Sequence, residues 1–256
     1  MLETKEIVIR DLLISYRQSV PSAEAPVAIL LHGWRSDASA WGATMHFLDT
    51  LGYASYALDL PGFGSSETPR DTYGVDLYAG LVNEFMKKLR IQNAVLIGHS
   101  FGGRIAIVLA VKYASIVRKL VLVDSAGLRE ESMKLGIVKR IAHLVSPFFQ
   151  PSFMQPVRRA IYRAMGAEDY TATPQMTGTF VKTISENLTS MLPQIRQETL
   201  LIWGESDIDT PITDAKKMSS LIPHARLEIL PMAGHFSFMD APGTFQTLLS
   251  SFLKNT

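Results

Sequence analysis

The sequence predicts an α/β fold, in which helices cover both faces of a mostly parallel central sheet and a helical segment is inserted into the chain. Two patterns lead to this prediction. Short apolar runs that suit strands buried on both faces alternate with longer runs that suit helices. Between residues 126 and 195 the helical patterns continue without a convincing strand, and afterwards the alternation resumes. We therefore expect a core domain of residues 1–125 and 196–256, with residues 126–195 inserted as a helical cap.

The composition agrees with a globular enzyme and excludes several other classes of protein. The chain has 256 residues, 47% apolar and 19% charged, so it can bury a large core and is too apolar for a disordered chain. The net charge of +1 gives no reason to expect a nucleic-acid partner. Because there is no cysteine, disulfides, thiolate zinc sites and a cysteine nucleophile are excluded.

The apolar runs predict neither a signal peptide nor a membrane span. Residues 1–13 mix charges with apolar residues and lack the long apolar stretch of a signal peptide. No uninterrupted apolar run approaches the length that crosses a bilayer. We expect a cytoplasmic protein that is a monomer or a small homo-oligomer.

The first half of the chain begins with a hairpin and continues with alternating strands and helices. Apolar runs within residues 5–18 flank Arg10 and Asp11 and predict a β-hairpin. Buried strands are then expected at residues 27–31, 53–58, 94–97 and 117–123. Helices are expected at residues 39–51, 75–89 and 105–113, the second with its apolar face at Leu77, Leu81, Phe85 and Leu89.

The second half contains the inserted segment and the return of the alternation. Within the insertion, helical patterns lie at residues 130–144, 153–165 and 174–188, separated by prolines. Strands are then expected at residues 199–203 and 226–230, and helices at residues 211–221 and 242–253. Pro242 suits the first turn of the last helix, where its missing N–H costs nothing.

A match to the pattern G-x-S-x-G lies between the strand at 94–97 and the helix at 105–113. It consists of Gly98, His99, Ser100, Phe101 and Gly102. A sharp strand-to-helix turn strains the backbone of the serine and exposes its hydroxyl, and it needs small residues two positions before and after. The N–H of the first helical residue has no intrahelical partner and can bind an anion. The alternative is an ordinary glycine-serine loop, but the flanking strand and helix favour a nucleophile.

A serine nucleophile needs a base, and the base needs an acid that orients it. His235 follows the last expected strand, and Asp207 follows the strand before it. Because parallel strands end at one edge of their sheet, these loops can converge on Ser100. Asp209 and Asp124 are the alternative acids. His32 and His99 are expected to be packed, hydrogen-bonded structural residues.

The chain resembles the α/β-hydrolase-fold serine hydrolases over essentially its whole length. The resemblance rests on five motifs in the order of that family: HGW at 32–34, DLPGFGSS at 59–66, GHSFGG at 98–103, GESDIDTP at 204–211 and GHF at 234–236. It implies Ser100 as the nucleophile, His235 as base and then acid, and Asp207 as the orienting acid. It also implies an oxyanion hole formed by the backbone N–H groups of Trp34 and Phe101. Some family members place the acid where Asp124 stands.

No cofactor is expected. The turn-rich loop at residues 59–66 lacks the lysine and the spacing of a P-loop, so a tight turn beside the site is the better interpretation. No linear zinc or calcium motif is present in the sequence. The expected partner is a small-molecule ester.

The cap is expected to contribute an apolar substrate chamber. Taken singly, its large apolar residues are best explained as the cap's own core, and together they suggest the chamber. They are Met133, Leu144, Phe148, Phe149, Phe153, Met154, Met165, Met176 and Phe180.

These features favour a carboxylic-ester hydrolase that acts on short to medium, largely apolar esters. One alternative is a carbon–carbon bond hydrolase of ring-fission products, although those relatives often place tryptophan where Phe236 stands. Another is a ligand receptor or signalling partner that keeps the catalytic residues. Epoxide hydrolases and haloalkane dehalogenases use an aspartate nucleophile, and Ser100 argues against both.

Overall fold

The computed structural model describes residues 2–128 and 174–254. Its strands are β1 (Glu3–Ile9), β2 (Leu12–Ser19), β3 (Val27–Leu31), β4 (Ala54–Leu58), β5 (Ala94–His99), β6 (Val117–Val123), β7 (Thr199–Gly204) and β8 (Ala225–Leu230). Its α-helices are α1 (Gly42–Thr50), α2 (Val75–Lys88), α3 (Phe101–Lys112), α7 (Thr177–Ser185), α8 (Ile212–Leu221), α9 (Ser237–Asp240) and α10 (Pro242–Lys254). Short 3₁₀ helices lie at Ala38–Trp41, Ala114–Ile116, Pro174–Met176 and Thr189–Gln194.

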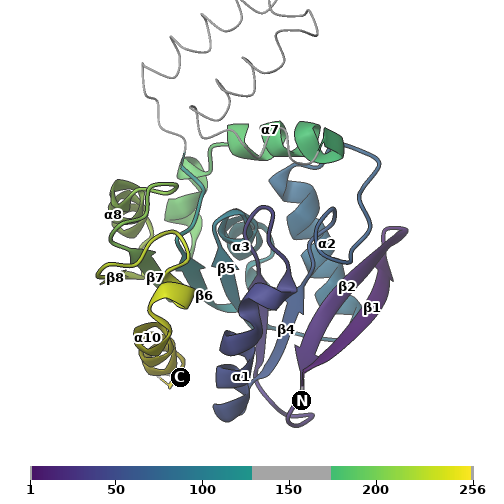
Figure 1. Cartoon of the computed structure of the whole chain (residues 1–256), viewed down its shortest axis with the longest axis horizontal. Coiled ribbons are helices and arrows are strands. Elements are labelled where there is room, and N and C mark those ends of the chain that lie inside the picture. Colours follow the sequence, from purple (N-terminus) through teal and green to yellow (C-terminus); the bar gives the residue numbers. More distant parts are fainter. Residues whose placement is uncertain (1, 129–173, 255–256) are drawn as a thin grey trace, which may run out of the picture.

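The strands form a single sheet in the order β1-β2-β4-β3-β5-β6-β7-β8 (Figure 1). β1 pairs antiparallel with β2, and β2 pairs antiparallel with β4. Every other pairing, from β4 through to β8, is parallel. The prediction of a mostly parallel sheet is therefore confirmed, and the carboxyl ends of β3, β5, β6, β7 and β8 meet at one edge.

Helices cover both faces of the sheet, as predicted, with α1 and α10 on one face and α2, α3 and α8 on the other (Figure 1). The strand residues alternate between the two resulting cores. Ile29 and Leu31 face the core of α2 and α3, whereas Ala28 and Leu30 face the core of α1 and α10. Because neighbouring residues of a strand point to opposite faces, strands buried on both sides must be apolar throughout.

Helix α7 crosses the carboxyl edge of the sheet and is hydrogen-bonded to the loop before α2 (Figure 1). Tyr73 donates its backbone N–H to Oγ1 of Thr179 at 3.0 Å. Val75, at the start of α2, donates its N–H to the carboxylate of Glu186 at 3.2 Å. The described end of the insertion is thus anchored on the core. The helices predicted at residues 130–144 and 153–165 lie outside the described residues, and the division into core and cap stays a prediction.

The predicted apolar face of α2 is only partly correct. Leu81 and Phe85 are buried, but Leu77 is 38% exposed, and Tyr78 and Val82 take its place in the core. Residues four apart on a helix drift by roughly 40° per step at 3.6 residues per turn, so a row of them curls away from one face. The short helix α9 was not predicted, because its four residues are too few to show a period.

The described residues include no helix long and apolar enough to cross a membrane.

Candidate active site

Ser100 sits at the apex of the turn between β5 and α3, with a strained backbone. Its φ of 50° and ψ of −110° lie in a region that residues with a side chain rarely adopt. The turn is held by the N–H of Ser100, which donates to the carbonyl of Val123 at 3.1 Å, and by Ala126, which donates to the carbonyl of Ser100 at 3.1 Å. The serine therefore has the conformation expected of a nucleophile at this turn.

The glycines around Ser100 are required by close backbone contacts. A Cβ atom on Gly98 would lie 2.6 Å from the carbonyl oxygen of Gly102, and one on Gly102 would lie 2.1 Å from that of Leu31. At Gly103 the obstacle is a side chain, since a Cβ there would lie 2.0 Å from Oγ of Ser125. The expectation of small residues on both sides of Ser100 is confirmed.

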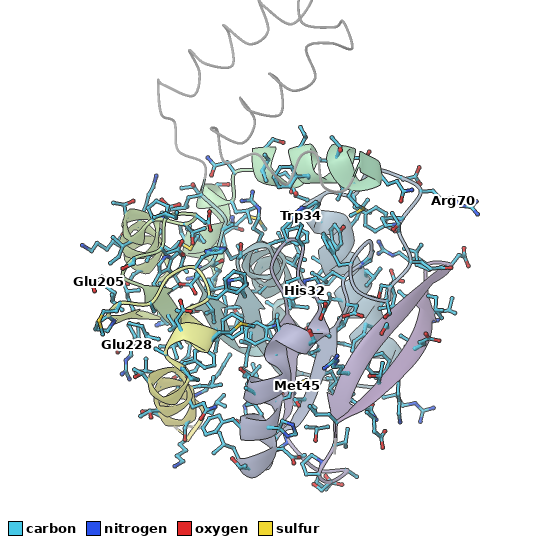
Figure 2. All side chains as sticks on the ribbon, viewed as in Figure 1. His32, Trp34, Met45, Arg70, Glu205 and Glu228 are labelled. Atoms are coloured by element: carbon cyan, nitrogen blue, oxygen red, sulfur yellow. The ribbon has the colours of Figure 1, made fainter. Side chains whose placement is uncertain are left out.

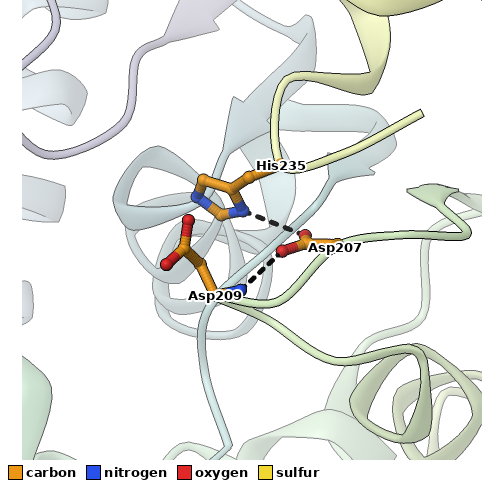
Figure 3. A group of neighbouring side chains, drawn as sticks. All are labelled: Asp207, Asp209 and His235. Carbon is orange, nitrogen blue, oxygen red and sulfur yellow. Dashed lines mark hydrogen bonds and ion pairs between the residues drawn. The ribbon is translucent and has the colours of Figure 1, made fainter. Parts of the chain in front are cut away.

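His235 and Asp207 form a hydrogen-bonded pair between the loops after β8 and β7 (Figure 3). Nδ1 of His235 lies 2.9 Å from Oδ2 of Asp207, whose side chain is fully buried. The carboxylate also accepts hydrogen bonds from the N–H groups of Asp209 and Thr210 and from the hydroxyl of Thr210. Nδ1 therefore carries a proton, and Nε2 has no hydrogen-bond partner within the described residues.

The pairing changes the titration of both groups. Burial disfavours the charged form of Asp207, but hydrogen bonds from His235 and Thr210 outweigh this cost and hold its pKa below the usual value. Burial also disfavours the charged form of His235, and the hydrogen bond to Asp207 together with its charge outweighs that cost. The pKa of His235 is therefore raised.

Asp124, the alternative acid after β6, is hydrogen-bonded to backbone N–H groups instead of to His235. It is fully buried, and its carboxylate accepts from the N–H of Gly204 at 2.8 Å and from the N–H of Ser237 at 3.0 Å. It thus ties β6 to β7 and to the start of α9. Asp207, not Asp124, is the carboxylate hydrogen-bonded to His235.

Asp209, the other alternative acid, lies beside the same histidine (Figure 3). One ligand atom from each of Asp207, Asp209 and His235 lies within 4.8 Å of the others, a grouping that could hold a metal ion. The linear motifs could not reveal this group, because it joins two loops that are distant in sequence. The expectation that no cofactor is needed stays a prediction.

The loop after β3 brings Trp34 to the cavity that also contains Ser100. His32 fixes this loop: its Nδ1 donates to the carbonyl of Gly33 at 2.7 Å, and its Nε2 accepts from the N–H of Leu60 at 3.0 Å. Burial lowers the pKa of His32, which suits a neutral ring with one donor and one acceptor. In the described part of the chain, neither the N–H of Trp34 nor that of Phe101 donates a hydrogen bond.

The indole of Trp34 packs between the main body of the protein and α7 (Figure 2). Its ring lies 4.8 Å from that of Phe63, 5.2 Å from Phe101 and 5.0 Å from Phe180 of α7. The cluster thus joins aromatic side chains from four segments of the chain, and three of them, Trp34, Phe101 and Phe180, line the cavity.

The loop at residues 59–66 is a tight turn beside the site, as predicted. The carboxylate of Asp59 accepts from the N–H groups of Ala38 and Ser65 at 2.7 and 2.9 Å, and so closes its own loop. Gly62 and Gly64 have positive φ angles of 88° and 55°. The polar groups of the loop are thus bonded within it and to the segments beside it.

A cavity of about 670 Å³ brings the predicted site residues together. Ser100, His235, Trp34 and Phe101 all line it, and Asp207 lies behind His235. Several other residues that no sequence motif indicates also line the cavity: Arg35, Ser36, Arg104, Ala126, Thr183, Ile184 and Thr210. The sequence indicates two of them weakly by their closeness to predicted site residues. Arg104 lies four residues after Ser100, and Thr210 lies three residues after Asp207.

Comparison with known proteins gives a family match over most of the chain. The model of the Alpha/beta hydrolase family matches residues 28–245. The 2-hydroxy-6-oxo-6-phenylhexa-2,4-dienoate hydrolase of Comamonas testosteroni is 26% identical over 271 residues, which are 95% of this chain and 92% of that protein.

Solved structures resemble this one over nearly the whole chain. A membrane phospholipase A described as a bacterial virulence factor has a TM-score of 0.78 and 26% identity, with 100% of this chain and 87% of that chain covered. The enol-lactonase of Burkholderia xenovorans has a TM-score of 0.77 and 23% identity, with 98% and 100% covered.

Proposed function

The chain belongs to the alpha/beta hydrolase family, and we propose that within it the protein is a serine hydrolase of carboxylic esters. The observation that carries this proposal is the strained turn of Ser100, which shares one cavity with a histidine whose Nδ1 is bound to a buried carboxylate. That arrangement is what a hydroxyl nucleophile requires, because the alcohol is a weak nucleophile until a base removes its proton.

The reaction follows from these roles. Nε2 of His235 accepts the proton of Ser100 as its Oγ attacks the ester carbonyl, and Asp207 stabilises the imidazolium that forms. His235 then protonates the departing alcohol, which leaves an acyl group on Ser100. A water molecule, deprotonated by His235, attacks this acyl group, and the acid is released as the proton returns to Ser100.

We assign the developing oxyanion to the backbone N–H groups of Trp34 and Phe101. Both residues line the cavity, and both N–H groups are free of protein acceptors in the described residues. Phe101 is the first residue of α3, so the positive end of the helix dipole adds to its N–H. Donors that are already oriented need no rearrangement when the charge develops.

The substrate is proposed to be a short to medium, largely apolar ester. Trp34, Phe180, Ile184 and Phe236 give the described part of the cavity an apolar wall, and a lid of residues 126–195 would enclose it further. A closed chamber limits chain length, because a long acyl chain needs an exit.

Carbon–carbon bond hydrolysis of a ring-fission product is the second candidate. It is favoured by the similarity to the Comamonas testosteroni hydrolase, whose named substrate is a dienoate. Phe236 argues against it, because its side chain offers no hydrogen-bond donor next to His235.

The test is a comparison of kcat/KM across substrates under one set of conditions. It uses p-nitrophenyl esters from acetate to palmitate beside 2-hydroxy-6-oxo-6-phenylhexa-2,4-dienoate, with Ser100→Ala as the background control. We expect a maximum at short or medium chains. A maximum at palmitate would contradict the closed chamber, and a higher value on the dienoate than on every ester would favour the second candidate.

A further inference from the structure

Arg104 brings a buried positive charge to the catalytic cavity. It lies one helical turn after Ser100 in α3 and is among the residues that line the cavity, yet it is only 4% exposed. Arginine is rarely buried to this extent unless its charge has a partner. A guanidinium in this position is expected to have hydrogen-bond acceptors or a negative charge beside it.

Among the described residues, only part of the guanidinium of Arg104 has a hydrogen-bond partner. One of its terminal nitrogens, Nη2, donates to the backbone carbonyl of Glu186. Nε is buried and has no hydrogen-bond partner within the described residues. A guanidinium has five N–H donors, so a single carbonyl leaves most of them unused.

The acidic side chain that acts on the charge of Arg104, Glu186, does not pair with it. The carboxylate of Glu186 is directed at the backbone N–H of Val75, with its two oxygens 3.3 and 3.2 Å from that nitrogen. Burial lowers the pKa of Arg104 to about 10, with Glu186 acting in the opposite direction, so the side chain stays protonated at neutral pH. Residues 2–128 and 174–254 supply no ion pair to Arg104. A buried cation without an ion pair is costly, and a second carboxylate would reduce that cost.

We propose that Arg104 binds a carboxylate of the substrate, so that the preferred esters carry a free carboxylate beside the scissile bond. This inference rests on the proposed ester hydrolysis at Ser100. A guanidinium matches a carboxylate through two parallel N–H···O bonds, which fix orientation as well as charge. The largely apolar wall of the cavity would hold the carbon chain between the carboxylate and the ester.

A purely structural role is the competing explanation. In that case Arg104 only ties α3 to the segment after α7 through the carbonyl of Glu186. Its replacement would then lower the activity on charged and neutral esters by the same factor. The ratio of the two activities separates the explanations, because a structural defect does not distinguish between substrates.

The experiment measures kcat/KM for two pairs of esters at neutral pH. Monoethyl adipate against ethyl hexanoate places a carboxylate on the acyl side, and 4-acetoxybenzoate against its methyl ester places one on the alcohol side. For the wild-type protein we expect the charged member of at least one pair to be preferred. In Arg104→Gln this preference should fall by about 10- to 100-fold, as expected for the loss of a charged hydrogen bond.

Two further variants serve as controls. Arg104→Lys keeps the charge but loses the paired donors, so it should keep part of the preference and remain informative if Arg104→Gln does not fold. Lys112→Gln removes one charge from the last turn of the same helix, where Lys112 bonds to Asp76 on the surface, and it should leave the preference unchanged.

The outcomes separate this inference from the proposed function. A wild-type protein that prefers the neutral member of both pairs overturns the role of Arg104 without any variant. An unchanged preference in Arg104→Gln assigns the residue a structural role. If no ester is hydrolysed, the proposed function fails. In that case the carboxylate site is tested by binding alone. Calorimetry compares the affinity of monoethyl adipate for Ser100→Ala with its affinity for the same variant that also carries Arg104→Gln, and equal affinities would overturn the role of Arg104.

Discussion

Nε2 of His99 donates a hydrogen bond of 2.7 Å to the backbone carbonyl oxygen of His235. A carbonyl can only accept, so this nitrogen carries the proton of the ring. Burial, followed by the proximity of His235, lowers the pKa of His99 to about 3 and keeps the ring neutral. Because His99 directly precedes Ser100, the bond fixes the loop of His235 to the turn that carries the serine.

Ser100→Ala should abolish ester hydrolysis while leaving the fold intact. Loss of the nucleophile in enzymes of this kind lowers turnover on the order of 10⁶-fold. The measurement is turnover by the purified variant, with circular dichroism as the control for folding. A fluorophosphonate should also label the wild-type protein at Ser100. A folded variant that keeps a tenth of the activity, or labelling elsewhere, would rule out Ser100.

Asp207→Asn should lower turnover by about 10⁴ at neutral pH, because an amide favours the wrong tautomer of the histidine. Asp124→Asn should lower it far less, since the carboxylate of Asp124 contacts the N–H groups of Gly204 and Ser237. Both variants are compared by steady-state kinetics on one p-nitrophenyl ester. The reverse order of the two effects would transfer the role of orienting acid to Asp124.

The midpoint of the acid limb in the pH profile of kcat/KM should lie above pH 6.5. His235 must be neutral to accept a proton, and its pKa is raised from the ordinary value of 6.5. Activity therefore falls as the pH drops through this raised pKa. Replacement of Asp207 by Asn removes the main cause of the rise and should move the limb to lower pH. The check is kcat/KM from pH 5 to 9 for both proteins, and a limb that stays in place would exclude the pairing as its origin.

Asp124→Asn should change the pH dependence of stability. Burial raises the pKa of Asp124 from 3.8 to about 7, although hydrogen bonds from Ser237 and Gly204 oppose the rise. A carboxyl whose folded pKa is raised contributes stability that is present below pH 3.8 and lost as the pH rises through about 7. The free energy of unfolding of the Asn variant, relative to that of the wild type, should therefore rise by on the order of a few kcal/mol between pH 4 and pH 8. Urea unfolding at both pH values measures this, and a relative loss at pH 8 would mean that the pKa is lowered.

Gly102→Ala should destabilise the protein, because its Cβ would lie 2.1 Å from the backbone oxygen of Leu31. Overpacking of this kind costs about 1–3 kcal/mol or more where backbone cannot move aside. Gly243→Ala in α10 is the matched control, since a Cβ there meets nothing within 4 Å. Thermal unfolding compares the two. Equal Tm values for both variants would show that the turn around Ser100 tolerates a side chain.

The sequence by itself determined most of the helices and strands that the structure describes, and the order of the candidate site residues. Strands β3 and β6 match the expected residues 27–31 and 117–123. The apolar run fills all of β3 and the last four residues of β6, because strand residues that are buried on both faces must be apolar. The spacing of Gly98 and Gly102 likewise defined the turn of Ser100, since close backbone contacts exclude a side chain there. Both patterns involve residues that are near one another along the chain, although the backbone oxygen that confines Gly102 belongs to Leu31 of β3.

Only the tertiary structure decided which distant residues meet. Asp124 and Asp207 both follow strands of the sheet, and their sequence positions alone could not show that Asp207 contacts His235 while Asp124 binds backbone N–H groups. The burial of Arg104 and the bond between His99 and His235 were equally hidden. Contacts between loops depend on strand order and on the path each loop takes over the packed core. Local patterns of apolar residues contain no information about strand order or about the paths of the loops.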